Sequence, residues 1–317
     1  MWVFSPAFCF LPSATMAVRR KICIFAAMKR SRQHSHRRKP SSRRGLWIAL
    51  LLLTAVAMMA CTMFRKPASA AGSGSVALPY EDEARPEKRT SALQGLEIPA
   101  MKGQQGQILR RTGYTTCYNA HYRLPYWTAW HLTAAHTTGP HKRKGVSFSE
   151  DEDVPFPRAT NSDYMRSGYD RGHMCPSGDN KWDRKAQQDC FLFTNMCPQS
   201  HNLNGGDWND LEMACRRWAK KYGEVYIVCG PMVDTKHRTI GRNRVAVPYA
   251  FYKVVLRMNP SPRAIGFVYE NEDGHRPMSD YVLTVDDVER LTGIDFFPSL
   301  PDNIESRIEA QADLSEW

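Results

Sequence analysis

The sequence lacks several patterns that would place it in other classes of protein. It has no Cys-x-x-Cys pair, so a structural zinc site with that common ligand spacing is not expected. It has no internal repeat, which argues against a solenoid or a propeller. Its first 66 residues contain no aspartate or glutamate. With 317 residues, 42% of them hydrophobic, the chain can still bury the core of one large or two small domains.

The positive charge of the chain is confined to its N-terminal end. The formal net charge is +11, but residues 1–66 hold 13 of the 43 lysines and arginines. The remaining 30 basic residues stand against 32 acidic ones, so the rest of the chain has a net charge of −2. The overall charge therefore says nothing about a nucleic-acid-binding face on the folded part, and such a partner has to be argued from particular residues.

An uncharged, apolar run follows the basic N-terminal segment, residues 1–44. It extends from Gly45 to Phe64 and is near the length of about 20 residues that a helix needs to cross a bilayer. Positive charge ahead of such a run keeps the N-terminus in the cytoplasm and sends the rest of the chain across the membrane. We therefore predict a transmembrane or signal segment at residues 45–64, through which the chain associates with a membrane. A helix buried in a protein core is the less favoured alternative.

The fate of this segment stays open among three alternatives. Ala68-Ser69-Ala70 has the small-x-small form of a signal-peptidase site, Cys61 ends a weak match to a lipoprotein acylation box, and without either the helix stays as an anchor. Met28, followed by Lys29-Arg30, opens a standard export sequence and is an alternative start of the chain. In each case we expect an exported protein, periplasmic or at the cell surface, that is membrane-anchored or released after signal cleavage.

Residues 65–95 are rich in alanine, glycine, serine, proline and charge, which predicts a flexible linker. Residues 96–317 have the pattern of a single domain in which strands and a few helices alternate unevenly, an α+β class. One helix is expected over residues 206–222, where apolar residues recur at helical spacing before Gly223, and a shorter one over residues 285–291. Strands are expected at residues 122–132, 190–195, 225–229, 245–256 and 264–269.

Six cysteines lie within this domain: Cys117, Cys175, Cys190, Cys197, Cys215 and Cys229. In an exported domain they are compatible with disulfide bonds, whose pairing the sequence does not determine. Buried free thiols are an alternative of about equal weight.

The stretch with the most chemical information lies between Tyr169 and Glu212. It contains the tetrapeptide Asp170-Arg171-Gly172-His173, then Asn195, and then Asn204 and Glu212 near the start of the long predicted helix. Asn204 and Glu212 are eight positions apart, which is about 80° around a helix. Both side chains can therefore face one side if the helix includes Asn204.

These residue types suit the hydrolysis of a phosphodiester. A base must deprotonate the attacking water, and an imidazole, with an unperturbed pKa of about 6.5, does this near neutral pH. A cation must offset the charge on the phosphate oxygens and the leaving oxygen, which hydrated Mg²⁺ does with few protein ligands. A guanidinium matches the geometry of a phosphate. His173, the two asparagines and Arg171 are candidates for these tasks.

With these residues, the stretch resembles the DNA/RNA non-specific endonuclease family, which includes Serratia-type secreted nucleases and mitochondrial endonuclease G. The hallmark of that family is a DRGH tetrapeptide followed by a TNxxPQ…LNxGxWxxLE pattern, found here at residues 194–199 and 203–212. The similarity covers roughly residues 110–305, and exported members of the Bacteroidetes type look most similar. It implies an α+β, ββα-metal (His-Me finger) nuclease fold with a central antiparallel sheet flanked by helices. In that fold a β-hairpin carries the histidine and a crossing helix carries the metal ligand.

The resemblance also implies a role for each residue of the site. His173 would be the general base, and Asn204 the one direct protein ligand of Mg²⁺, with Mn²⁺ as an alternative cation. Asn195 and Glu212 would hold the metal-bound waters, and Arg171 would stabilise the phosphate. A further arginine ahead of the motif binds substrate in the family, and Arg143 is the nearest candidate here. The implied reaction is hydrolysis of internal phosphodiester bonds in DNA and RNA, which leaves 5′-phosphate ends.

Contact with DNA and RNA would run mainly through the phosphate backbone, so we expect weak sequence preference. Because the domain is nearly neutral, a local basic groove is expected rather than a cationic surface. Its candidate residues are Arg166, Arg184, Arg216, Arg217, Lys220 and Lys221. Some members of the family form dimers, but the sequence shows no interface, and a homodimer stays open.

Each of these residues also has a structural interpretation that requires no catalytic role. His173 alone could be a core histidine, and Asn204, before two glycines, could simply cap a helix. Glu212 could be a solvated charge, and Arg171 could form a structural ion pair with Asp170 or another acid. Two other functions also stay open: a catalytically inactive nucleic-acid-binding surface protein on a nuclease scaffold, and a phosphodiesterase for small substrates.

Overall fold

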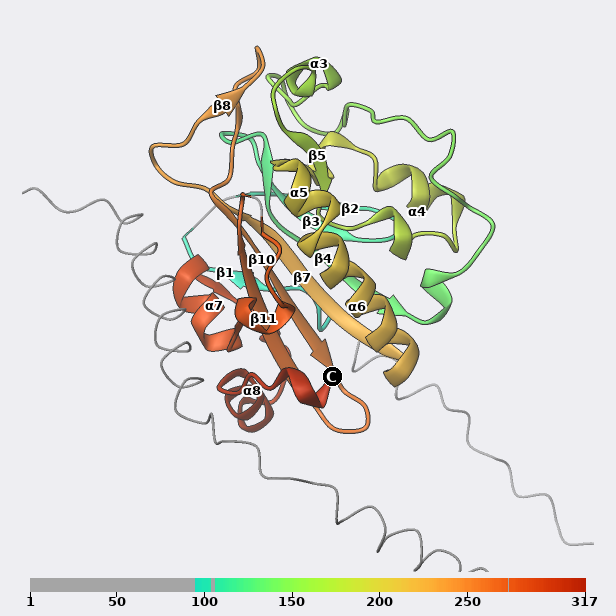
Figure 1. Cartoon of the computed structure of the whole chain (residues 1–317), viewed down its shortest axis with the longest axis vertical. Coiled ribbons are helices and arrows are strands. Elements are labelled where there is room, and N and C mark those ends of the chain that lie inside the picture. Colours follow the sequence, from blue (N-terminus) through green and yellow to red (C-terminus); the bar gives the residue numbers. More distant parts are fainter. Residues whose placement is uncertain (1–94, 104–105, 273) are drawn as a thin grey trace, which may run out of the picture. The chain divides into compact units, whose positions relative to one another are not determined.

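The computed structural model describes residues 95–103, 106–272 and 274–317 (Figure 1). The predicted basic segment, the transmembrane or signal segment at residues 45–64 and nearly all of the predicted linker lie outside these residues. They therefore stay predictions, as do the export and the location that depend on them. Within the described ranges, no helix is both long and apolar enough to cross a membrane.

A large antiparallel sheet forms the centre of the described domain. Within residues 106–272 and 274–317, seven strands join in the order β12-β11-β10-β7-β4-β3-β2. All residues of β10 and all but the first of β7 are buried, because other elements cover both faces of the sheet. The predicted α+β class with a central antiparallel sheet is therefore confirmed. The strands are β2 (Gln107–Arg110), β3 (Thr115–Asn119), β4 (Leu124–Thr133), β7 (Glu224–Met232), β10 (Ala250–Arg257), β11 (Arg263–Glu270) and β12 (Val282–Leu283).

Helix α6 (Asp207–Tyr222) crosses one face of this sheet, over β7 and β4 (Figure 1). Its apolar side chains recur at every third or fourth position and are buried against the strands. Trp218 stacks on Phe267 of β11, with 6.2 Å between the ring centroids. Gly223 ends the helix with a φ of 89°. The helix predicted over residues 206–222 is therefore confirmed, together with its end.

Helix α7 (Val285–Thr292) covers the opposite face. Side chains alternate along a strand, so the residue before Phe267, Gly266, faces away from α6. A Cβ atom at Gly266 would meet Cγ2 of Val288 at 2.6 Å, which places α7 on that second face and explains why glycine occupies the position. The predicted helix is confirmed and ends at Gly293, whose φ of 72° is left-handed.

Shorter elements surround these layers. Helix α8 (Asp302–Glu309) packs beside α7 and β11. Within the described residues, three further pairs of strands are β5 (Asp170–His173) with β6 (Met196–Gln199), β1 (Ala100–Met101) with β13 (Ile294–Asp295), and β8 (Thr239–Ile240) with β9 (Val245–Ala246). The remaining short helices are α3 (Asn161–Tyr164), α4 (Arg184–Asp189) and α5 (His201–Gly205).

Two predicted strands differ from the structure. The strand at residues 190–195 is wrong, because the chain leaves α4 there and forms a 3-10 turn over Phe193–Asn195. Phe193 is buried by packing from this turn into the core, so the apolar run reflects burial and not pairing between strands. The strand predicted at residues 245–256 is interrupted between β9 and β10, where Pro248 has no N–H to donate to a neighbouring strand.

The six cysteines of the domain are all buried free thiols. Of the two alternatives that the sequence left open, the structure therefore shows free thiols and not disulfides. Burial raises the pKa of the Cys117 thiol to about 11 and that of the Cys229 thiol to about 12. Both groups stay protonated at neutral pH and act as small apolar side chains of the core.

Candidate active site

Strand β5 carries Arg171 and His173 and pairs antiparallel with β6, with His173 opposite Met196. Alternation along the strand puts the side chains of Arg171 and His173 on one face. Gly172, between them, faces Gln199 of β6, and a Cβ atom there would meet Oε1 of Gln199 at 2.2 Å. The glycine of the tetrapeptide is therefore required by the close approach of β6.

Asn195 holds the chain that follows His173. Its Oδ1 accepts a hydrogen bond from Cys175 N at 2.9 Å, and its Nδ2 donates to Cys175 O at 2.9 Å and to Cys190 O at 2.8 Å. The side chain is fully buried, and backbone groups form hydrogen bonds with both the oxygen and the nitrogen of its amide. β5 and β6 are joined by residues 174–195 and not by a tight turn, and Asn195 ties the two ends of this long connection together.

The imidazole of His173 packs against two aromatic rings. Phe191 lies edge-on with 5.0 Å between the ring centroids, and Phe148 lies 5.8 Å away. The backbone oxygen of His173 accepts a hydrogen bond from Nε1 of Trp208 at 3.3 Å, which joins β5 to the first turn of α6. Burial, followed by the charge of Arg143, lowers the pKa of the imidazole to about 3. The ring is therefore neutral at physiological pH.

The two nitrogens of His173 differ in environment. Nε2 is buried and has no hydrogen-bond partner in the described part of the chain. Nδ1 is not among the buried atoms that lack a hydrogen-bond partner there. A neutral imidazole carries its proton on one nitrogen and a free lone pair on the other.

Asn204 lies on α5, whose first turn is capped by Ser200. Its Nδ2 donates a hydrogen bond to Oδ2 of Asp170 at 3.0 Å. Nδ1 of the exposed His201 lies 2.9 Å from the same carboxylate oxygen. Asp170 is the first residue of β5, so the strand that carries His173 also holds the amide of Asn204, and Figure 1 shows α5 and β5 side by side. An ion pair with Arg171 was the one role that the sequence offered for Asp170.

Glu212 lies on α6 and not on the same helix as Asn204. The chain breaks between the two helices at Gly206, where φ is −109° and ψ is −111° and a Cβ atom would meet Asn202 O at 2.4 Å. The long helix therefore does not include Asn204, which was the condition for both side chains to face one side of it. Burial raises the pKa of Glu212 to about 7, against the opposing charges of Lys253 and Arg216.

Arg216 belongs to a buried charged group behind Glu212 and not to a basic groove. Its Nη1 donates to Oδ1 of Asp179 at 2.9 Å and lies 3.9 Å from Oε2 of Glu212. Asp179 also accepts a hydrogen bond from Nε1 of Trp130 at 3.1 Å and is 3% exposed. The earlier expectation that Arg216 is available to bind phosphate is therefore wrong, because Asp179 neutralises it.

Lys253 is a residue of this group that sequence reasoning missed. It lies on β10 and is fully buried, and its Nζ has no hydrogen-bond partner within the described residues. Nζ lies 4.2 Å from the ring centroid of Trp208, which suits a cation–π contact. Burial opposes its charge, but Cys229 and Glu212 outweigh this effect and raise the pKa of Lys253. A lysine inside a run apolar enough for a central strand was the available signal.

Arg171 pairs with a neutral residue. Its Nε and Nη2 donate to Oδ1 of Asn161 at 3.0 and 2.6 Å, and its guanidinium lies 5.4 Å from the centroid of Phe148. The ion pair with Asp170 that stood as an alternative is not what the structure shows. Arg171 therefore lies on the same strand face as His173, and neither Asn161 nor Phe148 neutralises its positive charge.

Arg143 reaches the same region from a separate loop. The residue is exposed, and its guanidinium lies 5.7 Å from the ring centroid of Phe191, the ring that packs edge-on against His173. After burial, Arg143 is the second cause of the low pKa of His173, and it also opposes the raised pKa of Glu212. The structure therefore brings Arg143 to the ring that packs against His173.

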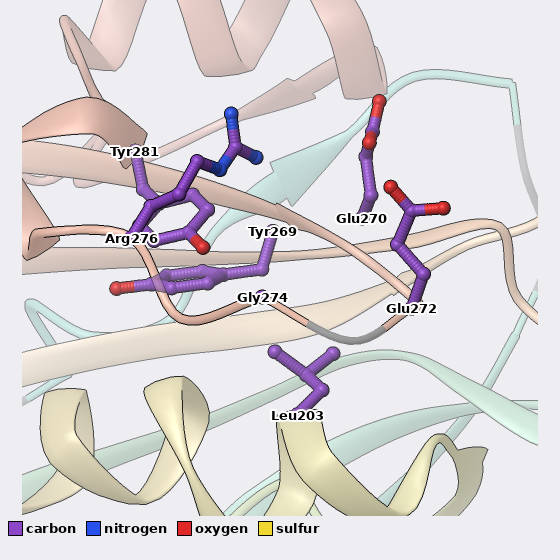
Figure 2. A pocket seen from close by; sticks show the side chains of 7 residues that line it. All are labelled: Leu203, Tyr269, Glu270, Glu272, Gly274, Arg276 and Tyr281. Atoms are coloured by element: carbon purple, nitrogen blue, oxygen red, sulfur yellow. The ribbon is translucent and has the colours of Figure 1, made fainter.

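A pocket of about 270 Å³ lies on the Leu203 side of α5. Its other lining residues are Tyr269, Glu270, Glu272, Gly274, Arg276 and Tyr281. Figure 2 shows the two glutamates on one side and Arg276 over Tyr281 on the other. Two carboxylates make this pocket unfavourable for a polyanionic backbone, so the candidate site is the surface between β5, α5 and α6.

An antiparallel pair of strands that carries a histidine, followed by a helix that crosses the sheet, defines the ββα-metal class of nuclease fold. A sequence profile of the DNA/RNA non-specific endonuclease family matches residues 94–303, and the chain belongs to this family. The resemblance that the DRGH motif indicated is therefore confirmed.

Known proteins of this family align with the same part of the chain. The mitochondrial nuclease EXOG of Danio rerio is 36% identical over 206 residues, which cover 60% of this chain and 60% of that protein. Mitochondrial endonuclease G of Bos taurus is 32% identical over 209 residues, or 61% of this chain and 70% of the relative. A chain in the crystal structure of the EndoG/EndoGI complex has a TM-score of 0.60 and 32% identity, over 64% of this chain and 91% of that chain. The chain spans 56–60% of the length of the EXOG relatives that it matches.

Proposed function

We propose that this protein is a Mg²⁺-dependent endonuclease that hydrolyses internal phosphodiester bonds of DNA and RNA and leaves 5′-phosphate ends. The observation that carries the proposal is the hydrogen bond from Asn204 Nδ2 to Asp170 Oδ2. It joins the amide that would bind the cation to the short strand that ends at His173. Relatives named as nucleases support the same activity.

The side chains present suit a hydrated Mg²⁺ ion. Asp170 accepts a hydrogen bond from Nδ2 of Asn204, so Oδ1 of Asn204 remains for a hard cation. Glu212 offers a carboxylate from the neighbouring helix to the waters that Mg²⁺ retains. When bound, the cation would stabilise the negative charge on the phosphate and the leaving oxygen. Mn²⁺ has the same preference for oxygen ligands and is expected to substitute.

His173 would accept the proton of the attacking water at Nδ1, with the proton of the neutral ring on Nε2. Because burial and Arg143 keep the ring neutral, this acceptor form is present at physiological pH. A base of very low pKa is weak. A bound phosphodiester would bring negative charge beside Arg143, which raises the pKa of the imidazole and strengthens it as a base.

The two arginines would bind the phosphate next to His173. The hydrogen bonds to Asn161 use Nε and Nη2 of Arg171 and leave Nη1 for a phosphate oxygen. Arg143 is exposed and would meet the same phosphate from the Phe191 side. For Asn195 we propose a positioning role in place of contact with metal-bound water, because the backbone engages its whole amide.

A cleavage assay with purified protein tests this function. We expect plasmid DNA and RNA to be degraded with Mg²⁺, the reaction to stop with EDTA, and added Mg²⁺ or Mn²⁺ to restore it. Bis-p-nitrophenyl phosphate, supplied separately, should be hydrolysed far more slowly than polymeric DNA. Binding of DNA without any cleavage would favour the inactive scaffold, and efficient hydrolysis of the small ester alone would favour a phosphodiesterase for small substrates.

Lys253 provides a test of the charged group behind Glu212. In Lys253→Met the buried cation is lost, so the pKa of Glu212 rises further above about 7. The acting form of Glu212 is the carboxylate, which is present above this pKa. The acid limb of the pH–rate profile should therefore move to higher pH by about one unit. Lys236→Met, on an exposed loop, is the matched control, and an unchanged acid limb in Lys253→Met would refute the link between the two residues.

A further inference from the structure

Three carboxylates gather between α7 and α8, on the face of the sheet opposite α6. Asp286 and Glu289 are three residues apart on α7, so they share one side of that helix. Glu309 is the last residue of α8. One carboxylate oxygen of each of the three residues lies within 4.8 Å of the corresponding oxygens of the other two.

Glu309 is the buried member of this cluster. The residue is 5% exposed, and its Oε1 is buried with no hydrogen-bond partner in the part of the chain that the structure describes. A buried carboxylate of this kind is unfavourable unless a hydrogen bond or a cation offsets its loss of hydration. Two further carboxylates lie within 4.8 Å of its own, and together these observations indicate a missing positive ligand.

Among the described residues, no ion pair brings a basic side chain to Asp286, Glu289 or Glu309. Arg290 of α7 pairs with Asp287 instead. Burial, followed by the charge of Glu289, raises the pKa of Glu309 to about 9, and Glu305 and Asp295 add to the effect. The neighbouring carboxylates thus disfavour the charged form of Glu309, the form that a bound cation would favour.

We propose that Asp286, Glu289 and Glu309 bind a divalent cation of the Ca²⁺ type that links α7 to α8. Ca²⁺ takes six to eight oxygen ligands at about 2.3–2.6 Å, so two of its ligands can be up to about 5 Å apart, which accommodates the observed limit of 4.8 Å. Mg²⁺ binds through one or two carboxylates and keeps its waters, whereas Ca²⁺ accepts three carboxylates in a flexible geometry.

One ligand is already oriented for this purpose. Oε1 of Glu289 accepts a hydrogen bond from Phe296 N at 2.8 Å, which fixes the carboxylate and leaves its second oxygen for the cation. Phe296 lies in the connection between the two helices. The bound ion would therefore hold α7, α8 and their connection together, and it would stabilise this region of the fold without taking part in the proposed catalysis.

The test measures Ca²⁺ binding by the purified full chain in equilibrium dialysis, with Ca²⁺ as the only divalent cation. Wild type is compared with Glu309→Gln, and Asn204→Ala is compared with Asn204→Ala/Glu309→Gln. We expect one bound Ca²⁺ fewer in the Glu309→Gln member of each pair. Because Asn204→Ala removes the proposed ligand of the catalytic cation, the second pair reports on the α7–α8 site independently of the proposed function.

Thermal unfolding is the second readout. At about 100 times its Kd, Ca²⁺ should raise the Tm of Asn204→Ala by roughly 5–10 °C. It should leave Asn204→Ala/Glu309→Gln unchanged, whereas Glu305→Gln, which removes a neighbouring carboxylate outside the three ligands, should keep the bound ion. Glu309→Gln preserves the shape of the side chain and removes a buried charge. If it nevertheless fails to fold, Asp286→Asn, at a half-buried position, replaces it in both comparisons.

Two results would overturn the proposal. One is the absence of both Ca²⁺ binding and Ca²⁺-dependent stabilisation in Asn204→Ala. The other is a bound Ca²⁺ that persists with the same affinity when Glu309, or Asp286 in its place, loses its charge. Either result would mean that the cluster holds protons and no metal, and neither would bear on the nuclease activity.

Discussion

Replacing His173 with alanine is expected to lower the rate of plasmid DNA cleavage by about 10²–10⁴-fold, the usual contribution of a general base. The proposed acceptor of the proton from water is Nδ1 of this residue, because Nε2 is buried without a hydrogen-bond partner in the described part of the chain. The substitution keeps the backbone oxygen that Trp208 binds, so the connection between β5 and α6 remains. The loss should therefore appear in the rate of cleavage and not in the fold.

The measurement is the initial rate of cleavage at saturating Mg²⁺, with circular dichroism and Tm recorded for each protein. His121→Ala is the matched control, because this histidine is exposed and belongs to the turn before β4. Added imidazole should restore part of the activity of His173→Ala, since a missing base can be replaced from solution whereas a lost structural contact cannot. A rate close to wild type in His173→Ala would rule out the proposed mechanism.

Replacing Asn204 with alanine is expected to lower the Mg²⁺-dependent rate by more than about 100-fold and to raise the Mg²⁺ concentration needed for half-maximal rate. The variant lacks the oxygen that would bind the cation, and it leaves the carboxylate of Asp170 without the N–H that it accepts. Asn204→Asp should not restore activity, because it would place a second negative charge next to Asp170.

This prediction is checked by Mg²⁺ titrations of the cleavage rate. Asn202→Ala, an exposed position on the same short helix, is the control and should keep the wild-type Mg²⁺ dependence. Asp170→Ala should lose about 10–100-fold, the usual effect of a residue that orients a metal ligand. An unchanged rate and an unchanged Mg²⁺ requirement in Asn204→Ala would show that the cation is bound elsewhere.

Helices α6 and α7 and strands β4, β7, β10 and β11 could be predicted, because their signals are local. Apolar residues at helical spacing and a terminal glycine mark α6 and α7, and both helices end where the pattern stops. The prediction failed where an apolar run had another cause. Residues 190–195 are hydrophobic because Phe193 packs into the core from a turn, and a strand and such a turn have the same composition.

The sequence predicted which residues belong to the candidate site better than it predicted the contacts that they make. The DRGH tetrapeptide and the two asparagine elements were sufficient to identify the family, which the profile match confirms. The contacts of Asn195, Arg216 and Lys253 could not be predicted. The decisive contacts join segments far apart in the chain, such as Lys253 of β10 and Trp208 of α6.

The amino-acid sequence by itself determined the family, the class of fold, the main helices and the residue types of the site, because each rests on patterns within short segments. Only the tertiary structure decided that the cysteines are free, that Asp170 orients Asn204, and that Glu309 of α8 meets Asp286 of α7. These features depend on which distant segments pack together. That choice follows from burial of the whole core, and no local pattern encodes it.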